Sequence, residues 1–256
     1  VLAVLACRTY AQEATPTSGS CAKAGTDSTC EWSYDASTKT LTISGTGQME
    51  SYVSEGNIFQ PTPWSAYASQ LQNINIGNGI TNIGDGAFRR TNVQNVSIPD
   101  SVTSLGIGAF ALTPKLTSID LPDHLQTMGW VAFQYSGLTS IDLPDSMTYV
   151  GAHALATTSL SELSVSDTTQ FSAAAFWDRG NVYPRDLKVT CRGDVAVCDD
   201  NVQSSYTKDA YAPAGTPDHP SIATHTKVYR QNRRIYTLEE ALQDAKDVNR
   251  VTIRYH

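Results

Sequence analysis

The sequence predicts an α/β solenoid with a parallel β-sheet on one face, a β cap at its N-terminal end and a small α+β module at its C-terminal end. Two observations indicate this fold. A motif occurs five times, starting at Leu71, Val93, Leu116, Leu138 and Leu160, with starts 22, 23, 22 and 22 residues apart. A unit of this length cannot enclose a core alone, so consecutive units must stack and share one. The last copy is degenerate, which is typical of the end of a capped array.

The first half of each copy predicts a short strand with one buried face, because apolar and polar residues alternate there. The inward positions are Ile74, Val96, Ile119, Ile141 and Leu163, and two residues later Ile76, Ile98, Leu121, Leu143 and Val165. Pro-Asp follows at residues 99–100, 122–123 and 144–145. Proline fixes φ and lacks an N–H donor, so these pairs predict turns.

The second half of each copy adds an apolar pair, a glycine and a closing Ala-Phe. The glycines predict turns that need a positive φ, at Gly84, Gly106, Gly129 and Gly151. The closing apolar residues are Phe88, Phe110, Phe133, Leu155 and Phe176. Coils stacked at a strand spacing of about 4.8 Å would arrange these side chains in an internal column. Each buried one contributes roughly 1.5–3 kcal/mol.

This pattern resembles a known repeat family. Leu-x-x-Ile-x-Leu-Pro-Asp, then Val/Met-Thr-x-Val/Leu-Gly and Ala-Phe, is similar to the BspA-like leucine-rich repeat of bacterial and protist surface proteins. The preceding segments 41–50 and 63–67 resemble the N-terminal cap that often precedes such repeats. The resemblance extends from Trp32 to Phe176. It implies a leucine-rich repeat fold and a role in adhesion, although one fold hosts many functions.

Residues 21–70 are predicted to form the N-terminal cap, since the first coil would otherwise expose its apolar face to water. Trp32–Tyr34 and Leu41–Ile43 alternate around a polar turn, which predicts a β-hairpin. Residues 65–71 are expected to form one helical turn leading into the solenoid. The solenoid and its C-terminal cap then occupy residues 71–198.

Four cysteines flank the repeats, Cys21 and Cys30 before them and Cys191 and Cys198 after them. In an exported chain four cysteines indicate disulfides, and two local pairs are the simplest of the three connectivities. A zinc site is the alternative, but there is no Cys-x-x-Cys and no histidine near either pair. We expect no metal and no cofactor.

Residues 1–20 are expected to be the remnant of a signal peptide and a leader. An apolar run ends in small residues and is followed by a polar segment, which is typical of a secretory signal with cleavage after Ala11. The alternative is a lipid anchor, because Val4 to Cys7 loosely resembles a lipobox in which Cys7 would be lipidated. Both interpretations place the protein outside the cell, either secreted or at the cell surface.

The C-terminal part changes in character. Residues 199–224 are polar, contain three prolines and lack periodicity, which indicates a linker. Residues 225–256 predict a small module with a hairpin from Val228, a helix capped at Thr237 that ends near Asp247, and a strand from Val251 to Tyr255. A module of this size is marginal alone, so we expect it to dock or to serve as an attachment element.

Charge and motifs exclude several classes of function. The formal net charge is −7, and residues 1–226 hold 21 acidic and 11 basic side chains, so the repeats have no basic surface for nucleic acid. After the first few residues no apolar stretch is long enough to span a bilayer. Nucleophile, metalloprotease and phosphate-loop motifs are absent, and we expect no enzyme activity. Arg192-Gly193-Asp194 lies between Cys191 and Cys198. One interpretation is an integrin-binding tripeptide presented on a disulfide loop, and the alternative is that the tripeptide occurs by chance.

The candidate binding surface follows from the strand pattern, because the residues that flank each inward Ile or Leu point out of the sheet. They form two polar columns on one continuous sheet. The first column is Asn73, Asn95, Ser118, Ser140 and Glu162, and the second is Asn75, Ser97, Asp120, Asp142 and Ser164. Asp120 and Asp142 would repel each other as neighbours, and a cation or basic partner could offset this cost. The alternative is that the columns are only solvated surface.

The sequence thus predicts a secreted or cell-surface repeat protein that binds protein partners. The family resemblance adds adhesion to host matrix proteins, host cell-surface proteins or other cells. The competing hypothesis is a structural spacer, in which the C-terminal module anchors the chain or recognises a surface partner. Deletion of residues 225–256 would separate the two, because only the spacer hypothesis predicts loss of surface retention with ligand binding intact.

Overall fold

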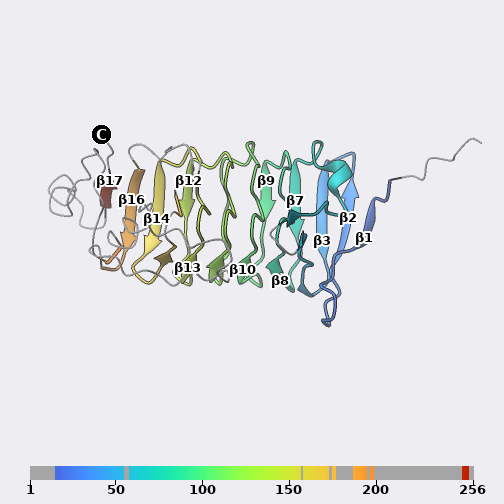
Figure 1. Ribbon diagram of the computed structural model, residues 1–256, viewed down its shortest axis with the longest axis horizontal. Helices are drawn as coiled ribbons and strands as arrows, with labels where there is room; N and C mark the ends of the chain where they lie inside the picture. Colours follow the sequence, from blue (N-terminus) through green and yellow to red (C-terminus); the bar gives the residue numbers. More distant parts are fainter. Residues whose placement is uncertain are drawn as a thin grey trace, which may run out of the picture.

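The computed structural model shows a rod of stacked coils whose strands lie side by side along the long axis (Figure 1). It describes residues 15–54, 58–156, 158–172, 175–176, 187–194 and 197–198, together with the backbone of 250–253. The segment with Cys7 that was predicted to be a signal remnant, the linker predicted at 199–224 and the hairpin and helix expected at 228–247 lie outside these described residues.

The first strands of the coils form two sheets on one face of the rod. One has the order β1-β2-β3-β7-β9 and the other the order β12-β14-β16-β17. The first comprises β1 (Ser18–Ser20), β2 (Glu31–Asp35), β3 (Thr40–Ser44), β7 (Asn73–Ile76) and β9 (Asn95–Ser97). The second comprises β12 (Ser140–Asp142), β14 (Glu162–Ser166), β16 (Leu187–Arg192) and β17 (Arg250–Ile253). Ile74 pairs in parallel with Val96, and Ile141 with Leu163, as the repeat alignment predicts.

A second set of strands forms another parallel sheet, with the order β15-β13-β11-β10-β8-β4. Five of these strands come from the second half of the five copies, which the sequence pattern alone did not identify as a strand, and β4 comes from the N-terminal cap. They are β4 (Gly47–Gln48), β8 (Ile80–Ile83), β10 (Ser104–Leu105), β11 (Thr127–Met128), β13 (Tyr149–Val150) and β15 (Gln170–Phe171). Each coil contributes a strand to this second face, and all coils except the third contribute one to the first face. The apolar core lies between the two faces.

The prediction of an α/β solenoid is wrong in its helical part. Among the described residues from 71 to 171, the strands are joined by turns and not by α-helices. A coil of 22 residues that already holds two strands leaves only a few residues per connection, too few for a stable helix. The helical turn expected before the first coil is present as the 3-10 helix η1 (Ser65–Tyr67).

The closing aromatic residues stack along the interior as predicted. Ring centroids are 5.3 Å apart between Phe88 and Phe110 and 5.4 Å apart between Phe110 and Phe133. Trp64 of the cap continues the column at 5.8 Å from Phe88, and its Nε1 donates a 2.9 Å hydrogen bond to the carbonyl of Ala87. The indole thus closes the open end of the column while its polar atom is satisfied.

A buried hydroxyl follows most closing residues, a regularity that the sequence analysis missed. Thr91 Oγ1 donates to the carbonyl of Phe88 at 2.8 Å, and Thr113 Oγ1 donates to that of Phe110 at 2.7 Å. Thr158 repeats the contact with Leu155 at 3.0 Å. A buried carbonyl without a partner is costly, so these threonines stabilise the turn between coils.

The four repeat glycines have a different role from the predicted one. None of Gly84, Gly106, Gly129 and Gly151 has a positive φ. A Cβ at Gly129 would lie 2.7 Å from the carbonyl carbon of Gly106 and 2.7 Å from the nitrogen of Ile107. Neighbouring coils approach too closely there for any side chain. A glycine in a regular element can serve either a positive φ or such a close approach, and here it serves the close approach.

The positive φ angles occur two residues later in each coil. They are 66° at Gly86, 60° at Gly108, 52° at Val131 and 55° at His153. The ring of Phe59 lies over the first two, 2.8 and 2.7 Å from where a Cβ would stand. Phe59 belongs to the hairpin of β5 (Val53–Ser54) and β6 (Ile58–Phe59). Because the Phe59 ring leaves no room for a Cβ, the first two coils have glycine at this position. The third and fourth coils have Val131 and His153 there.

A disulfide bond lies near each end of the rod. Disulfides join Cys21 to Cys30 and Cys191 to Cys198, which confirms the two local pairs. The predicted cap hairpin is formed by β2 and β3, which pair antiparallel with Trp32 opposite Ile43. At the other end β17 pairs antiparallel with β16, with Val251 opposite Val189, so the predicted last strand docks on the solenoid.

Candidate functional site

The predicted polar columns lie on the outer face of the first-strand sheets. Their register follows the ladders, with Asn73 opposite Asn95 and Ser140 opposite Glu162. Asn73 and Ser164 are half-buried, and the other eight predicted residues are exposed. Ladder pairing extends the first column to Lys188 at the C-terminal end, a residue that was not included in the prediction.

The face is not one continuous sheet, because the ladder is interrupted at the third coil. Ser118, Ile119 and Asp120 make no backbone hydrogen bond with any residue that the structure describes, although Thr139 donates to the Thr117 carbonyl at 3.1 Å. The third coil starts 23 residues after the second, one residue later than the other spacings. The additional residue lies between Phe110 and Leu116, before the third coil begins. The third coil keeps its register with the fourth, because Thr139 donates to Thr117 as Ser161 donates to Thr139.

A hollow of about 250 Å³ lies at this interruption. Ile119, Ile141 and Leu163 also border it, but their side chains are buried in the core, and Lys188 lies at its C-terminal side. Six of the ten predicted residues line it, namely Ser118, Asp120, Ser140, Asp142, Glu162 and Ser164. The other four, Asn73, Asn75, Asn95 and Ser97, do not.

The asparagines outside the hollow are engaged with each other and with the cap. Asn95 Nδ2 donates to Asn73 Oδ1 at 2.9 Å, and Asn73 Nδ2 donates to the carbonyl of Thr38 at 3.1 Å. These hydrogen bonds tie the first two coils to the cap hairpin. This part of the face therefore stabilises the stack of coils, and the hollow is the better candidate for a binding site.

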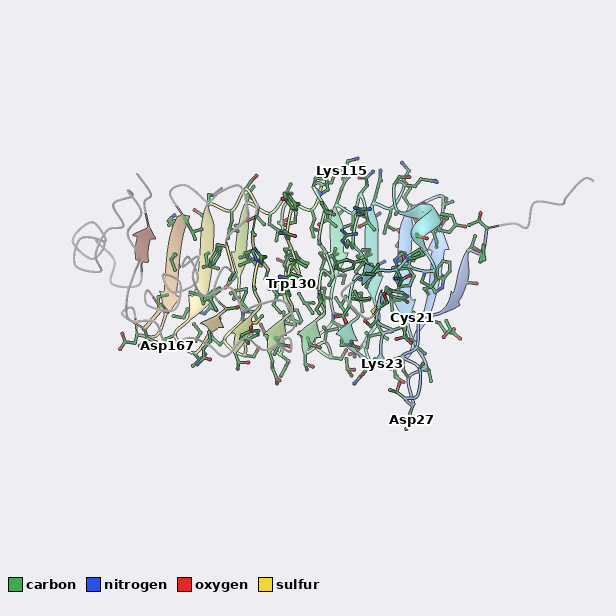
Figure 2. The ribbon with its side chains drawn as sticks, viewed as in Figure 1. Cys21, Lys23, Asp27, Lys115, Trp130 and Asp167 are labelled. Atoms are coloured by element: carbon green, nitrogen blue, oxygen red, sulfur yellow. A yellow bond between two sulfur atoms is a disulfide. The ribbon has the colours of Figure 1, made fainter. Side chains whose placement is uncertain are left out.

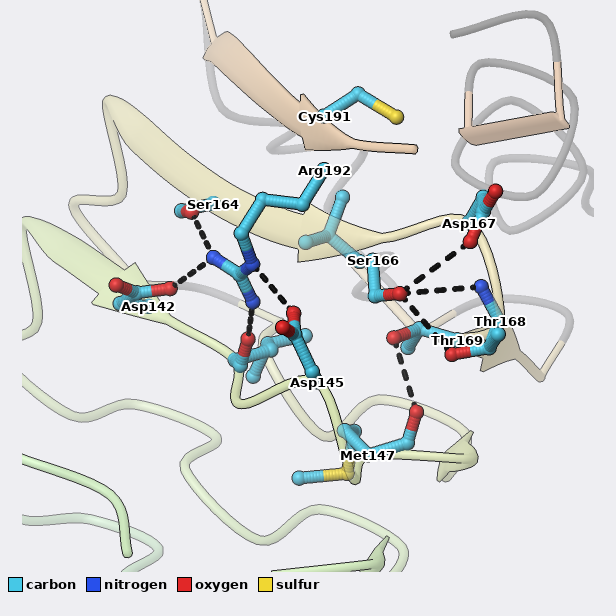
Figure 3. A network of polar contacts seen from close by, with 12 residues as sticks. Asp142, Asp145, Met147, Ser164, Ser166, Asp167, Thr168, Thr169, Cys191 and Arg192 are labelled. Carbon is cyan, nitrogen blue, oxygen red and sulfur yellow. Dashed lines mark hydrogen bonds and ion pairs between the residues drawn. The ribbon is translucent and has the colours of Figure 1, made fainter. Parts of the chain in front are cut away.

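Two basic residues of β16 reach back onto the face. Lys188 Nζ lies 3.0 Å from Glu162 Oε1. Arg192 reaches further and lies 2.6 Å from both Asp142 and Asp145 (Figure 3). Its guanidinium also donates to the hydroxyl of Ser164 and to the carbonyl of Leu143. Burial lowers the pKa of Arg192 and the hydrogen bonds to the two aspartates raise it, with a net increase.

The Arg192 contacts answer two questions that the sequence left open. Asp142 does have a basic partner, and that partner is part of the same chain. The integrin hypothesis needs a free arginine in the Arg-Gly-Asp tripeptide, and this arginine is held against two carboxylates. The geometry therefore argues against that hypothesis. Long-range pairing between residues 142 and 192 had no signal in the repeat pattern.

Asp120 differs from Asp142 in this respect. It is exposed and makes no ion pair with the described part of the chain. The hollow thus combines a carboxylate without a described ion-pair partner, two internally paired carboxylates and three serine hydroxyls. Such a surface can accept hydrogen bonds from a basic or polar side chain and pack against its aliphatic part.

In the described ranges no three His, Cys, Asp or Glu side chains stand close enough to hold a metal ion. No helix in the described part of the chain is long and apolar enough to cross a bilayer.

Comparison with known proteins gives a consistent result. Residues 65–182 match the sequence model of the BspA type leucine rich repeat region, in 6 copies. No curated protein matches the chain. A leucine-rich repeat protein from Eubacterium ventriosum is similar in structure, with 25% identity and a TM-score of 0.54 over 66% of this chain. One from Bacteroides ovatus has 18% identity and a TM-score of 0.38 over 57%. The chain covers 43% and 49% of the lengths of these two proteins.

Proposed function

We propose that this chain is a secreted or cell-surface protein that binds other proteins, because residues 65–182 match the BspA type leucine rich repeat model. The binding surface is the hollow at the third and fourth coils and the columns around it. Adhesion to host matrix proteins or to other cells is the physiological role. The chain acts by binding and not by catalysis, in keeping with its repeat family.

The observation that carries this proposal is the coincidence of the hollow with the predicted outward columns. Six outward-pointing residues of three successive coils, chosen from the repeat alignment alone, line one depression. Rigid solenoids present such surfaces because each coil repeats the same outward positions. Disulfides close both ends of the described solenoid, which suits an oxidising environment outside the cell.

The test uses Asp120, because its replacement breaks no internal ion pair. We expect Asp120→Lys to reduce binding of the full chain to immobilised purified matrix proteins at least tenfold while the melting temperature stays unchanged. Asp27→Lys is the matched control, since this exposed residue lies at the tip of a loop in the N-terminal cap (Figure 2). Equal binding by both variants and the wild type would contradict a binding site in the hollow.

The structural spacer remains the second candidate function, and one observation favours it. The strand β17 extends the solenoid at its C-terminal end by pairing with β16. A module that joins the end of the rod could hold it at a surface. Deletion of residues 225–256 that abolishes surface retention but preserves binding to matrix proteins would support the spacer.

A further inference from the structure

At the fourth coil, the guanidinium of Arg192 is bound by four acceptors that all lie at positions of the repeat. We call this set of contacts the Arg192 clamp. Three of its four acceptors come from one coil, namely the carboxylates of Asp142 and Asp145 and the carbonyl of Leu143. The fourth is the hydroxyl of Ser164 on the next coil. Figure 3 shows these groups converging on the guanidinium from the strand and from the Pro-Asp turn that follows it.

The same eight residues occur one coil earlier. Leu116–Asp123 and Leu138–Asp145 both read LTSIDLPD. The counterparts of Asp142, Leu143 and Asp145 are therefore Asp120, Leu121 and Asp123. The counterpart of Ser164 on the next coil is Asp142 itself, a stronger acceptor than serine.

The earlier copy holds no arginine from the described part of the chain. Asp120 and Asp123 are both exposed and neither forms an ion pair with a described residue. The carbonyl of Leu121 accepts no hydrogen bond from any residue that the structure describes. Asp120 also borders the hollow, which has room for the aliphatic part of an incoming side chain.

We propose that Asp120, the Leu121 carbonyl and Asp123 form a second guanidinium site, which takes an arginine side chain of a partner protein. This inference rests on the proposed function, because it names the chemistry that the partner presents. A guanidinium has five N–H donors in a planar fork and can serve two carboxylates and a carbonyl at once, whereas an ammonium is a single point charge. The net charge of −7 further favours a basic partner.

The second coil provides a natural comparison. It keeps the aspartate of the turn at Asp100 but has Ser97 where the third coil has Asp120. One of the two carboxylates is thus missing, and we expect this coil to bind arginine much more weakly.

The test is NMR titration of the full chain with N-acetyl-arginine amide, following the backbone amides of Asp120, Leu121 and Asp123. We expect saturable shifts at these amides, at least tenfold weaker binding of N-acetyl-lysine amide, and no saturable shift at Asp100. Asp120→Asn and Asp123→Asn should each weaken arginine binding about tenfold, because each removes a charge-assisted hydrogen bond. Asp100→Asn is the matched control and should change nothing.

A gain-of-function variant completes the test. Ser97→Asp restores the missing carboxylate of the second coil and should produce new saturable shifts at Asp100.

Equal affinity for the lysine and arginine amides, or weak shifts spread over all exposed carboxylates, would overturn the proposal. If arginine amide fails to bind while Asp120→Lys still abolishes binding to matrix proteins, this inference fails and the proposed function stands. If arginine binds but no matrix protein does, the site stands and the adhesive role fails.

Discussion

Gly129 shows how closely two coils approach in this solenoid. Its hydrogen atoms face the backbone of Gly106 and Ile107, where a methyl group would overlap both. Gly151 repeats the arrangement against Gly129 and Trp130. This column of glycines thus allows the coils to stack at the observed spacing of the second sheet. A larger residue at Gly129 or Gly151 would overlap the backbone of the preceding coil.

This contact predicts that Gly129→Ala destabilises the fold. We expect a loss of roughly 1–3 kcal/mol in the free energy of unfolding, because overpacking forces backbone shifts. The measurement is equilibrium denaturation of the oxidised protein. Gly77→Ala is the matched control, since its Cβ would meet no atom closer than 3.1 Å. Equal losses in the two variants would show that the backbone approach at Gly129 is not limiting.

At the scale of the element, the internal aromatic column links coils that could not fold alone. Phe110 is fully buried and its ring contacts the rings of Phe88 and Phe133. We expect Phe110→Ala to cost about 3–5 kcal/mol of stability through lost burial and the cavity that remains. Phe110→Leu imitates the natural Leu155 and should cost clearly less. A cost for Phe110→Ala below about 1 kcal/mol in thermal denaturation would contradict a shared core.

The interrupted ladder at the third coil gives a second prediction at this scale. The amide of Ile119 has no hydrogen-bond acceptor among the described residues, whereas Ile141 lies in the β12–β14 ladder. Hydrogen exchange of the folded protein should therefore be faster at Ser118–Asp120 than at Ser140–Asp142, since unbonded amides exchange without local opening. Similar protection of the two segments would mean that the sheet is continuous after all.

Much of this architecture could be predicted because each buried or turn position recurs in several copies of the repeat. The inward positions, the aromatic column, the cap hairpin and the two disulfide pairs all follow from period and local spacing. The role of Gly84 and its counterparts could not be predicted, because a glycine signals either a positive φ or a close approach and only coordinates distinguish them. The missing helices have a similar cause, since the apolar pairs that form the second sheet also suit a helical turn.

The candidate site was predicted unevenly for a related reason. Outward residues such as Asp120 and Ser140 follow from alternation within a strand. The Arg192 clamp joins segments 47 and 50 residues apart and lies where the repeat has ended. The hollow lies where the ladder is interrupted at the third coil. Neither a contact across irregular sequence nor a local loss of ladder hydrogen bonds leaves a periodic signal.

On the scale of the whole molecule, the rod has two ends fastened by disulfides and a face that changes along its length. The asparagines near the cap bind each other, and at the C-terminal side of the hollow Glu162 and Asp142 are paired with Lys188 and Arg192. Asp120, at the other side of the hollow, has no ion-pair partner among the described residues. The proposed function therefore places the partner at the third coil.

Hydrogen exchange of the full chain in complex with a bound matrix protein tests this central claim most directly. Comparison with the free chain maps every segment that the partner protects. We predict new protection at residues 116–123 and 138–145 and none in the second sheet, represented by residues 80–83 and 149–150. Protection confined to the second sheet or to residues 225–256, with no change at 116–123, would contradict a binding site on the outer face.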